Sequence, residues 1–155
     1  MEDDDDSGIS NPLVSGTHYR LFLKIAMLGT ELREFACAEQ IARTMLEVRP
    51  DLPYASISLG MNDFAAGRKN DGIRTLEATV ERFPNSQLAK ATLGVCLLDT
   101  DRSGWQQLLQ SVIDDGRDEY AIGLACAVLG RPNGYIDPTP SPEPAPSVPT
   151  HAMWA

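Results

Sequence analysis

Histidine and cysteine are scarce in this chain of 155 residues, which has only two histidines, His18 and His151, and three cysteines. So few imidazoles nearly exclude a multi-histidine metal site. Cys37, Cys96 and Cys126 form no C-x-x-C pair and lie among apolar residues, so neither a zinc site nor a disulfide framework is indicated. We expect all three to be reduced, inert thiols of the core.

Basic residues are outnumbered, since 13 Lys and Arg stand against 22 Asp and Glu and the formal net charge is −9. Nucleic acids and anionic membrane surfaces favour stripes of Lys and Arg, so neither is expected as a partner. The longest apolar stretch, 120–130, is too short for the roughly 20 residues that cross a bilayer, so no membrane insertion is expected. Residues 2–6 are all acidic, which is the opposite of a secretory signal, and we expect a cytoplasmic protein.

Motifs for catalysis are also missing. There is no G-x-x-x-x-G-K-[ST] phosphate loop, no G-x-G-x-x-G and no nucleophile elbow. Asp114, Asp115, Asp118 and Glu119 form an acidic cluster without the alternating ligands and turn glycine of a calcium loop, so we interpret it as a solvated helix junction. We therefore predict no catalytic site, no metal and no cofactor.

Charge and proline divide the chain into three parts. Residues 1–16 hold five acids and no base, and residues 131–155 hold seven of the eleven prolines. A run rich in proline lacks amide donors and a core-facing period. We predict a disordered acidic arm over 1–16, a disordered proline-rich tail over 131–155, and one folded helical domain over 17–130.

A spacing of 34 residues organises that domain. Leu59-Gly60 recurs as Leu93-Gly94, and proline recurs at 50 and 84. This period is typical of a helix-turn-helix solenoid, because one helix pair cannot bury its apolar face alone and stacks on the next. The pattern resembles the tetratricopeptide repeat, which places Gly60 and Gly94 where paired helices cross. We predict an all-α, tetratricopeptide-like solenoid of about three repeats with a C-terminal capping helix.

Local chemistry predicts seven helices, and no stretch alternates convincingly enough for a strand. Residues 103–106 have the sequence of a capping box, Asn85 is a good N-cap residue and Pro53 suits a first helical turn. The last helix is apolar on all sides, so the end of the stack, a partner or a second copy has to cover it. The expected helices span 18–31, 34–48, 53–66, 70–82, 86–99, 105–114 and 118–129.

The repeat also indicates where a ligand would bind. In tetratricopeptide folds the first helix of each pair lines a concave groove, and nine of the twelve groove positions here are apolar and larger than alanine. Relatives that grip a peptide carboxylate have Lys, Arg and Asn there, whereas this groove suits the apolar face of an amphipathic helix. The alternative is that these side chains are core or a dimer contact. The predicted groove residues are Leu23, Met27, Tyr54, Ile57, Met61, Phe64, Leu88, Val95 and Leu98.

A narrower resemblance covers about 17–130. The two and a half repeats, the Gly104-Trp-Gln segment, the charged segment 114–118 and the Ala/Leu helix that ends at Gly130 resemble bacterial type III secretion proteins of the HrpK type. These are related to needle-subunit chaperones of the YscG/PscG type. The resemblance implies a non-enzymatic cytoplasmic chaperone that binds the C-terminal helix of a secreted needle subunit and prevents premature polymerisation. In the needle-chaperone branch a second small helical protein completes the complex.

Two other classes of function stay open. In a scaffold or adaptor of the secretion apparatus, the same groove docks a folded partner and the proline-rich tail recruits another protein. An enzyme, or its regulatory subunit, would carry its chemistry in residues that no motif reveals. Deleting 131–155 distinguishes the first class, because an adaptor loses its function and a chaperone keeps its client.

Overall fold

Seven helices make up residues 15–130, the part of the chain that a computed structural model describes. The expected arm and tail lie outside these residues, apart from Ser15 and Gly16. Every helix begins and ends within two residues of the predicted bounds. Their bounds are α1 Gly16–Glu31, α2 Phe35–Val48, α3 Tyr54–Ala65, α4 Lys69–Arg82, α5 Gln87–Asp99, α6 Trp105–Asp115 and α7 Glu119–Val128.

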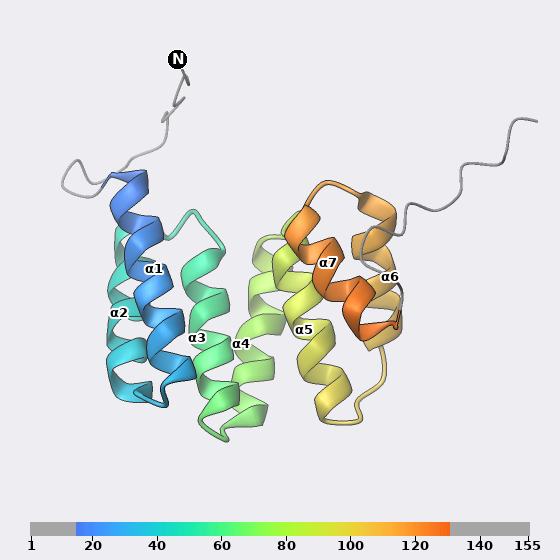
Figure 1. The fold of residues 1–155 in the computed structure, drawn as a ribbon, viewed down its shortest axis with the longest axis horizontal. Coiled ribbons are helices and arrows are strands. Elements are labelled where there is room, and N and C mark those ends of the chain that lie inside the picture. Colours follow the sequence, from blue (N-terminus) through green and yellow to red (C-terminus); the bar gives the residue numbers. More distant parts are fainter. Residues whose placement is uncertain (1–14, 131–155) are drawn as a thin grey trace, which may run out of the picture.

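The helices stack in a row of antiparallel pairs (Figure 1). α1 packs on α2, α3 on α4 and α5 on α6, and each pair then contacts the first helix of the next unit. α7 contacts both α5 and α6 and so covers the end of the row. The predicted all-α solenoid with a C-terminal capping helix is confirmed. Among the helices of 15–130, none is long and apolar enough to cross a membrane.

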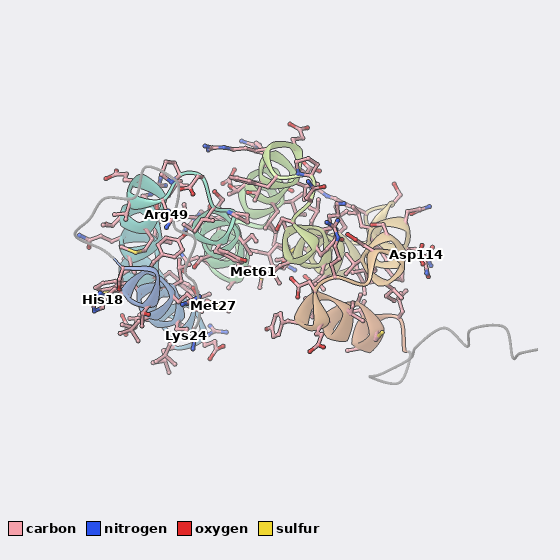
Figure 2. All side chains as sticks on the ribbon, turned by 90° about the horizontal axis from the view of Figure 1, so that it is seen from above. His18, Lys24, Met27, Arg49, Met61 and Asp114 are labelled. Atoms are coloured by element: carbon pink, nitrogen blue, oxygen red, sulfur yellow. The ribbon has the colours of Figure 1, made fainter. Side chains whose placement is uncertain are left out.

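The first helices of the units lie along one side of the row. Contacts join α1 to α3, α3 to α5 and α5 to α7. Seen from above in Figure 2, this row is curved, and its two end helices stand on the same side of the two middle ones. We call α1, α3, α5 and α7 the inner helices, because α2, α4 and α6 cover their other side.

Glycine allows the paired helices to approach closely. A Cβ atom on Gly60 would lie 2.7 Å from Cγ of Leu76, and a Cβ atom on Gly72 would lie 2.6 Å from the carbonyl oxygen of Gly60. A Cβ atom on Gly94 would lie 2.8 Å from Cδ2 of Leu109. Interiors packed at this density leave no room for an added methyl group. The expected positions of Gly60 and Gly94 at helix crossings are therefore confirmed.

The core is divided among the units rather than gathered at one centre. Its three largest clusters of buried residues lie between α3, α4 and α5, between α5, α6 and α7, and between α1, α2 and α3. Each unit therefore depends on its neighbours to cover its apolar side chains, as in other solenoids. The respective clusters include Ile57, Ile73, Leu76, Leu93 and Leu97, then Leu109, Val112, Ala121 and Ala125, then Tyr19, Leu23 and Met45.

A buried amide fixes the first unit to the second. Asn62 on α3 is buried, and its Oδ1 accepts a hydrogen bond of 2.9 Å from the hydroxyl of Thr30 on α1. Its Nδ2 donates to the carbonyl oxygen of Phe35 at 3.1 Å. Because both groups of the amide are satisfied, Asn62 sets the relative position of α1, α2 and α3 at little desolvation cost.

Two predicted helix caps are wrong. α6 follows Gly104, which has a φ of 95°, and no side chain caps this helix, so residues 103–106 do not form a capping box. The N-cap position belongs to Gly104, which has no side chain, so Ser103 lies one residue too early to cap the helix. Ser86, rather than Asn85, caps α5 by accepting a hydrogen bond from the amide of Ala89.

Candidate functional site

Three predicted groove residues form an exposed apolar surface on the inner helices. Met27 on α1 is 52% exposed, and Tyr54 and Met61 on α3 are 47% and 39% exposed. In Figure 2, Met27 on α1 and Met61 on α3 lie on the side of these two helices that faces the inside of the curved row. Tyr54 and Met61 are two helical turns apart, about 10 Å, so both project from the same face of α3. We call these three residues the inner face.

Leu23 and Ile57 were expected on the groove surface, and the structure places both in the core instead. Leu23 packs with Tyr19 and Met45, and Ile57 packs in the cluster that contains Leu76. Each inner helix has another inner helix beside it, so only a narrow stripe of its surface stays exposed. Leu23 and Ile57 lie outside that exposed stripe, in the core beneath the inner face.

The four remaining predicted groove residues are half-buried. Phe64 and Leu88 pack against the central core cluster. The ammonium nitrogen of Lys69 lies 5.2 Å from the centroid of the Phe64 ring and 2.5 Å from a carboxylate oxygen of Asp99. The Lys69 ammonium group, which Asp99 holds in place, therefore covers part of the Phe64 ring and leaves less of the ring accessible to a ligand. Val95 and Leu98 lie on α5, the helix that α7 covers in part.

A hollow of about 440 Å³ adjoins the inner face at the N-terminal ends of α3 and α5. Tyr54 and Leu88, two of the predicted residues, form part of its wall together with Phe83. The guanidinium carbon of Arg82 lies 5.2 Å from the centroid of the Phe83 ring, so a cation stands at this wall. The groove positions of the repeat did not predict this hollow. The feature of the sequence that could have indicated it is the apolar turn 83–84 between α4 and α5.

The acidic cluster near α7 is engaged in local structure. Asp118 caps α7, because its carboxylate accepts hydrogen bonds of 3.0 Å from the amides of Tyr120 and Ala121. Arg117 pairs with Asp115 and lowers the pKa of that carboxyl below its usual range. Within residues 15–130 no group of three or more His, Cys, Asp or Glu side chains is arranged to hold a metal ion.

The cysteines do not share one environment. Cys96 and Cys126 are buried, as expected, but Cys37 is exposed on α2 and is not a core residue. Burial raises the pKa of the Cys96 thiol to about 11, so it is protonated and unreactive near neutral pH. Cys37 differs because neighbouring Ala38, rather than Cys37, turns toward the α1 crossing at Gly29.

A second exposed apolar surface was not predicted. It lies on α1 and on Leu32, the residue that follows this helix, on the side opposite the buried Tyr19, Leu23 and Ala26. Its side chains are 41% to 65% exposed. The signal in the sequence is a repeat of large apolar residues at intervals of four, three and four between 21 and 32, which the 34-residue repeat did not single out. We call this surface the outer stripe, and it consists of Leu21, Phe22, Ile25, Leu28 and Leu32.

Comparison with protein families matches residues 9–133 to a family described as bacterial type III secretion protein (HrpB1_HrpK). The matched span contains all seven helices of the described chain, and hence both the inner face and the outer stripe. Comparisons with curated proteins and with solved structures give no match.

Proposed function

Because the chain belongs to the HrpB1_HrpK family of bacterial type III secretion proteins, we propose that it is a chaperone in the bacterial cytoplasm. It performs no catalysis and needs no cofactor. Its inner face holds an amphipathic helix of a secreted, needle-type subunit until that subunit is exported. The observation that carries this proposal is the exposure of Met27, Tyr54 and Met61 on two adjacent inner helices.

The chemistry of the inner face suits an apolar helix. Two methionines adapt their shape to the side chains they meet, and the tyrosine adds a large rigid area. The spacing of about 10 Å between Tyr54 and Met61 corresponds to anchors at i and i+7 on a helix that lies along α3. A bulky apolar residue at one end of such a helix would enter the hollow between Tyr54, Phe83 and Leu88.

The charge of the chain supports the same role. Only Arg20 is basic among the twelve groove positions, so the inner helices lack the cluster of cations that would grip a peptide carboxylate. The net charge of −9 keeps a chaperone bearing an aggregation-prone helix soluble and repels other complexes of the same sign.

The test is to change Met27→Glu and Met61→Glu together in the full-length chain. Co-purification of a co-expressed needle-type subunit from the same secretion system is then measured, with helical content followed by circular dichroism. Each carboxylate would enter an apolar contact unpaired, so we expect affinity to fall by at least about 100-fold. Because both methionines are largely exposed, the helical content should be unchanged.

A matched control is Ala36→Glu with Ala78→Glu, which adds the same charge at exposed positions of α2 and α4. This control should retain the client. A folded Met27→Glu, Met61→Glu variant that still retains the subunit would place the binding surface elsewhere. Loss of helical content in that variant, but not in the control, would assign the methionines to the fold.

A further inference from the structure

The outer stripe of α1 has the spacing of a helix-helix seam. Leu21, Ile25, Leu28 and Leu32 recur at intervals of four, three and four residues. At about 100° per residue, their mean direction is roughly opposite to the side of α1 that packs on α2 and α3. Residues repeating in this way interlock with a facing helix. No helix in residues 15–130 covers the stripe, which is about half exposed.

We propose that the outer stripe packs against the outer stripe of a second copy of this chain, with the two α1 helices antiparallel. A twofold axis that passes between Ala26 and Met27 brings Ile25 opposite Leu28 of the partner subunit. The same axis brings Leu21 opposite Leu32 of the partner subunit. Each pair occurs twice, so one row of four residues makes a self-complementary seam, as a twofold interface requires.

The charges beside the stripe favour a second, antiparallel copy of the chain as the partner. Arg20 and Lys24 lie along one edge of the stripe in the N-terminal part of α1, and Glu31 ends the same edge. In the antiparallel pair, Glu31 stands level with the midpoint between Arg20 and Lys24 of the partner subunit, about 3 Å along the axis from each. Opposite charges therefore meet twice across the seam.

Within a single α1 helix the same order of charges is unfavourable. The helix dipole favours acids in the first turn and bases in the last, whereas α1 has neither and ends on Glu31. An antiparallel copy places each basic half beside an acidic end and thereby compensates for this arrangement. At about 100° per residue, Lys24 and His18 fall on the two sides of the stripe, and Figure 2 shows both directed away from the remainder of the stack.

The area of the outer stripe is sufficient for a dimer. With roughly 100 Å² exposed on each of its five large side chains, the stripe offers about 500 Å² of apolar surface per chain. Two copies bury up to about 1,000 Å² through these side chains, and the charged side chains along the edge of the stripe add to the roughly 1,000 Å² that a specific interface needs. Residues 1–14 are a weaker match, because their apolar residues Ile9, Leu13 and Val14 are interrupted by Pro12.

The first experiment measures the mass of the full-length chain by light scattering after size exclusion, at concentrations up to about 100 µM. We expect a dimer. Leu28→Glu should raise the dissociation constant at least about 100-fold, because two carboxylates would face the apolar seam. The matched control Tyr120→Glu replaces an exposed hydrophobic residue on α7 and should leave the mass unchanged. Circular dichroism checks that both variants fold.

The second experiment tests the antiparallel charge pairing. Glu31→Lys alone should weaken the dimer about tenfold, since it sets like charges beside one another. Adding Arg20→Glu and Lys24→Glu to it reverses every charge on this edge and should restore the original dissociation constant to within about threefold. A parallel seam would already set Glu31 beside Glu31 of the partner subunit, so Glu31→Lys would not weaken it. An unchanged dissociation constant for Glu31→Lys, or failure of the rescue, would overturn the proposed geometry.

A full-length chain that stays monomeric at the highest concentration overturns the proposal. If hydrogen exchange then shows residues 9–14 protected in the wild type and released by Leu28→Glu, those residues occupy the stripe instead. A Leu28→Glu dimer as tight as the wild-type dimer would place the interface on another surface. All of these measurements are independent of client binding, so their failure leaves the role of the inner face unchanged.

Discussion

Gly72 is the glycine at which an added carbon atom would meet backbone rather than side chain. Its Cβ position lies 2.6 Å from the carbonyl oxygen of Gly60 and 2.8 Å from the amide nitrogen of Phe64. At Gly60 the nearest atom belongs to the side chain of Leu76, which has more freedom to move. The α3 and α4 crossing therefore depends more strictly on glycine at 72 than at 60.

We predict that Gly72→Ala destabilises the fold by about 1–3 kcal/mol, even though alanine favours helix formation. Urea unfolding measures the change in free energy. Gly16→Ala is the control, because a Cβ atom at Gly16 would have nothing within 4 Å, and its effect should stay within about 0.5 kcal/mol. Equal stability of the two variants would show that α3 and α4 can separate without cost.

Residue spacing predicted these crossings because the small residue at each crossing is a geometric requirement. The sequence could not show that Asn62 would bind Thr30 and the carbonyl of Phe35, since that contact depends on three helices at once. Likewise, Cys37 and Cys126 each stand between two alanines, yet only the latter turns into the core.

At the scale of single helices, α7 depends on its N-terminal cap. It has ten residues, which is too short to be stable alone in water. The carboxylate of Asp118 satisfies the amides of Tyr120 and Ala121, and its charge is favourable at the positive end of the helix. Since α7 covers α5 and α6, loss of this cap should expose the end of the stack.

Asp118→Ala should therefore lower the free energy of unfolding by about 0.5–2 kcal/mol. Asp114→Ala removes the same charge at the C-terminal part of α6, where an acid opposes the helix dipole, and should change stability by less than about 0.5 kcal/mol. Thermal unfolding of the two variants measures the difference. If both lose stability equally, net charge rather than capping is responsible.

Helix bounds were predictable because period, proline and turn residues act locally. Which side of a helix stays exposed was not predictable, because it depends on the neighbours. α1 is apolar on two opposite sides, and the sequence alone does not show which of Leu23 and Ile25 is buried. The structure buries Leu23 and exposes Ile25, which is why part of the predicted groove proved to be core and the outer stripe was not foreseen.

At the scale of the whole molecule, the core consists of clusters that connect only neighbouring units. Met45 belongs to the cluster between α1, α2 and α3, and Leu109 belongs to the cluster between α5, α6 and α7. No contact joins α1 or α2 to α5, α6 or α7 among residues 15–130. The stability of such a stack is the sum of local terms, so its two ends can open separately.

We predict that Met45→Ala and Leu109→Ala loosen opposite ends of the stack. Each deletes a buried side chain and should cost about 2–5 kcal/mol where it packs. In hydrogen exchange, Met45→Ala should raise exchange rates at least about tenfold across α1 and α2 and leave α6 and α7 unchanged. Leu109→Ala should produce the reverse pattern.

The central cluster decides between this outcome and its alternative. Ile57, Leu76 and Leu93 connect α3, α4 and α5, and each end unit packs on one side of them. If opening of one end breaks this cluster, both variants should raise exchange evenly along 16–128, and the stack would unfold as one unit. If the cluster holds, α3 to α5 should keep the slowest exchange in both variants, because these helices have neighbours on both sides.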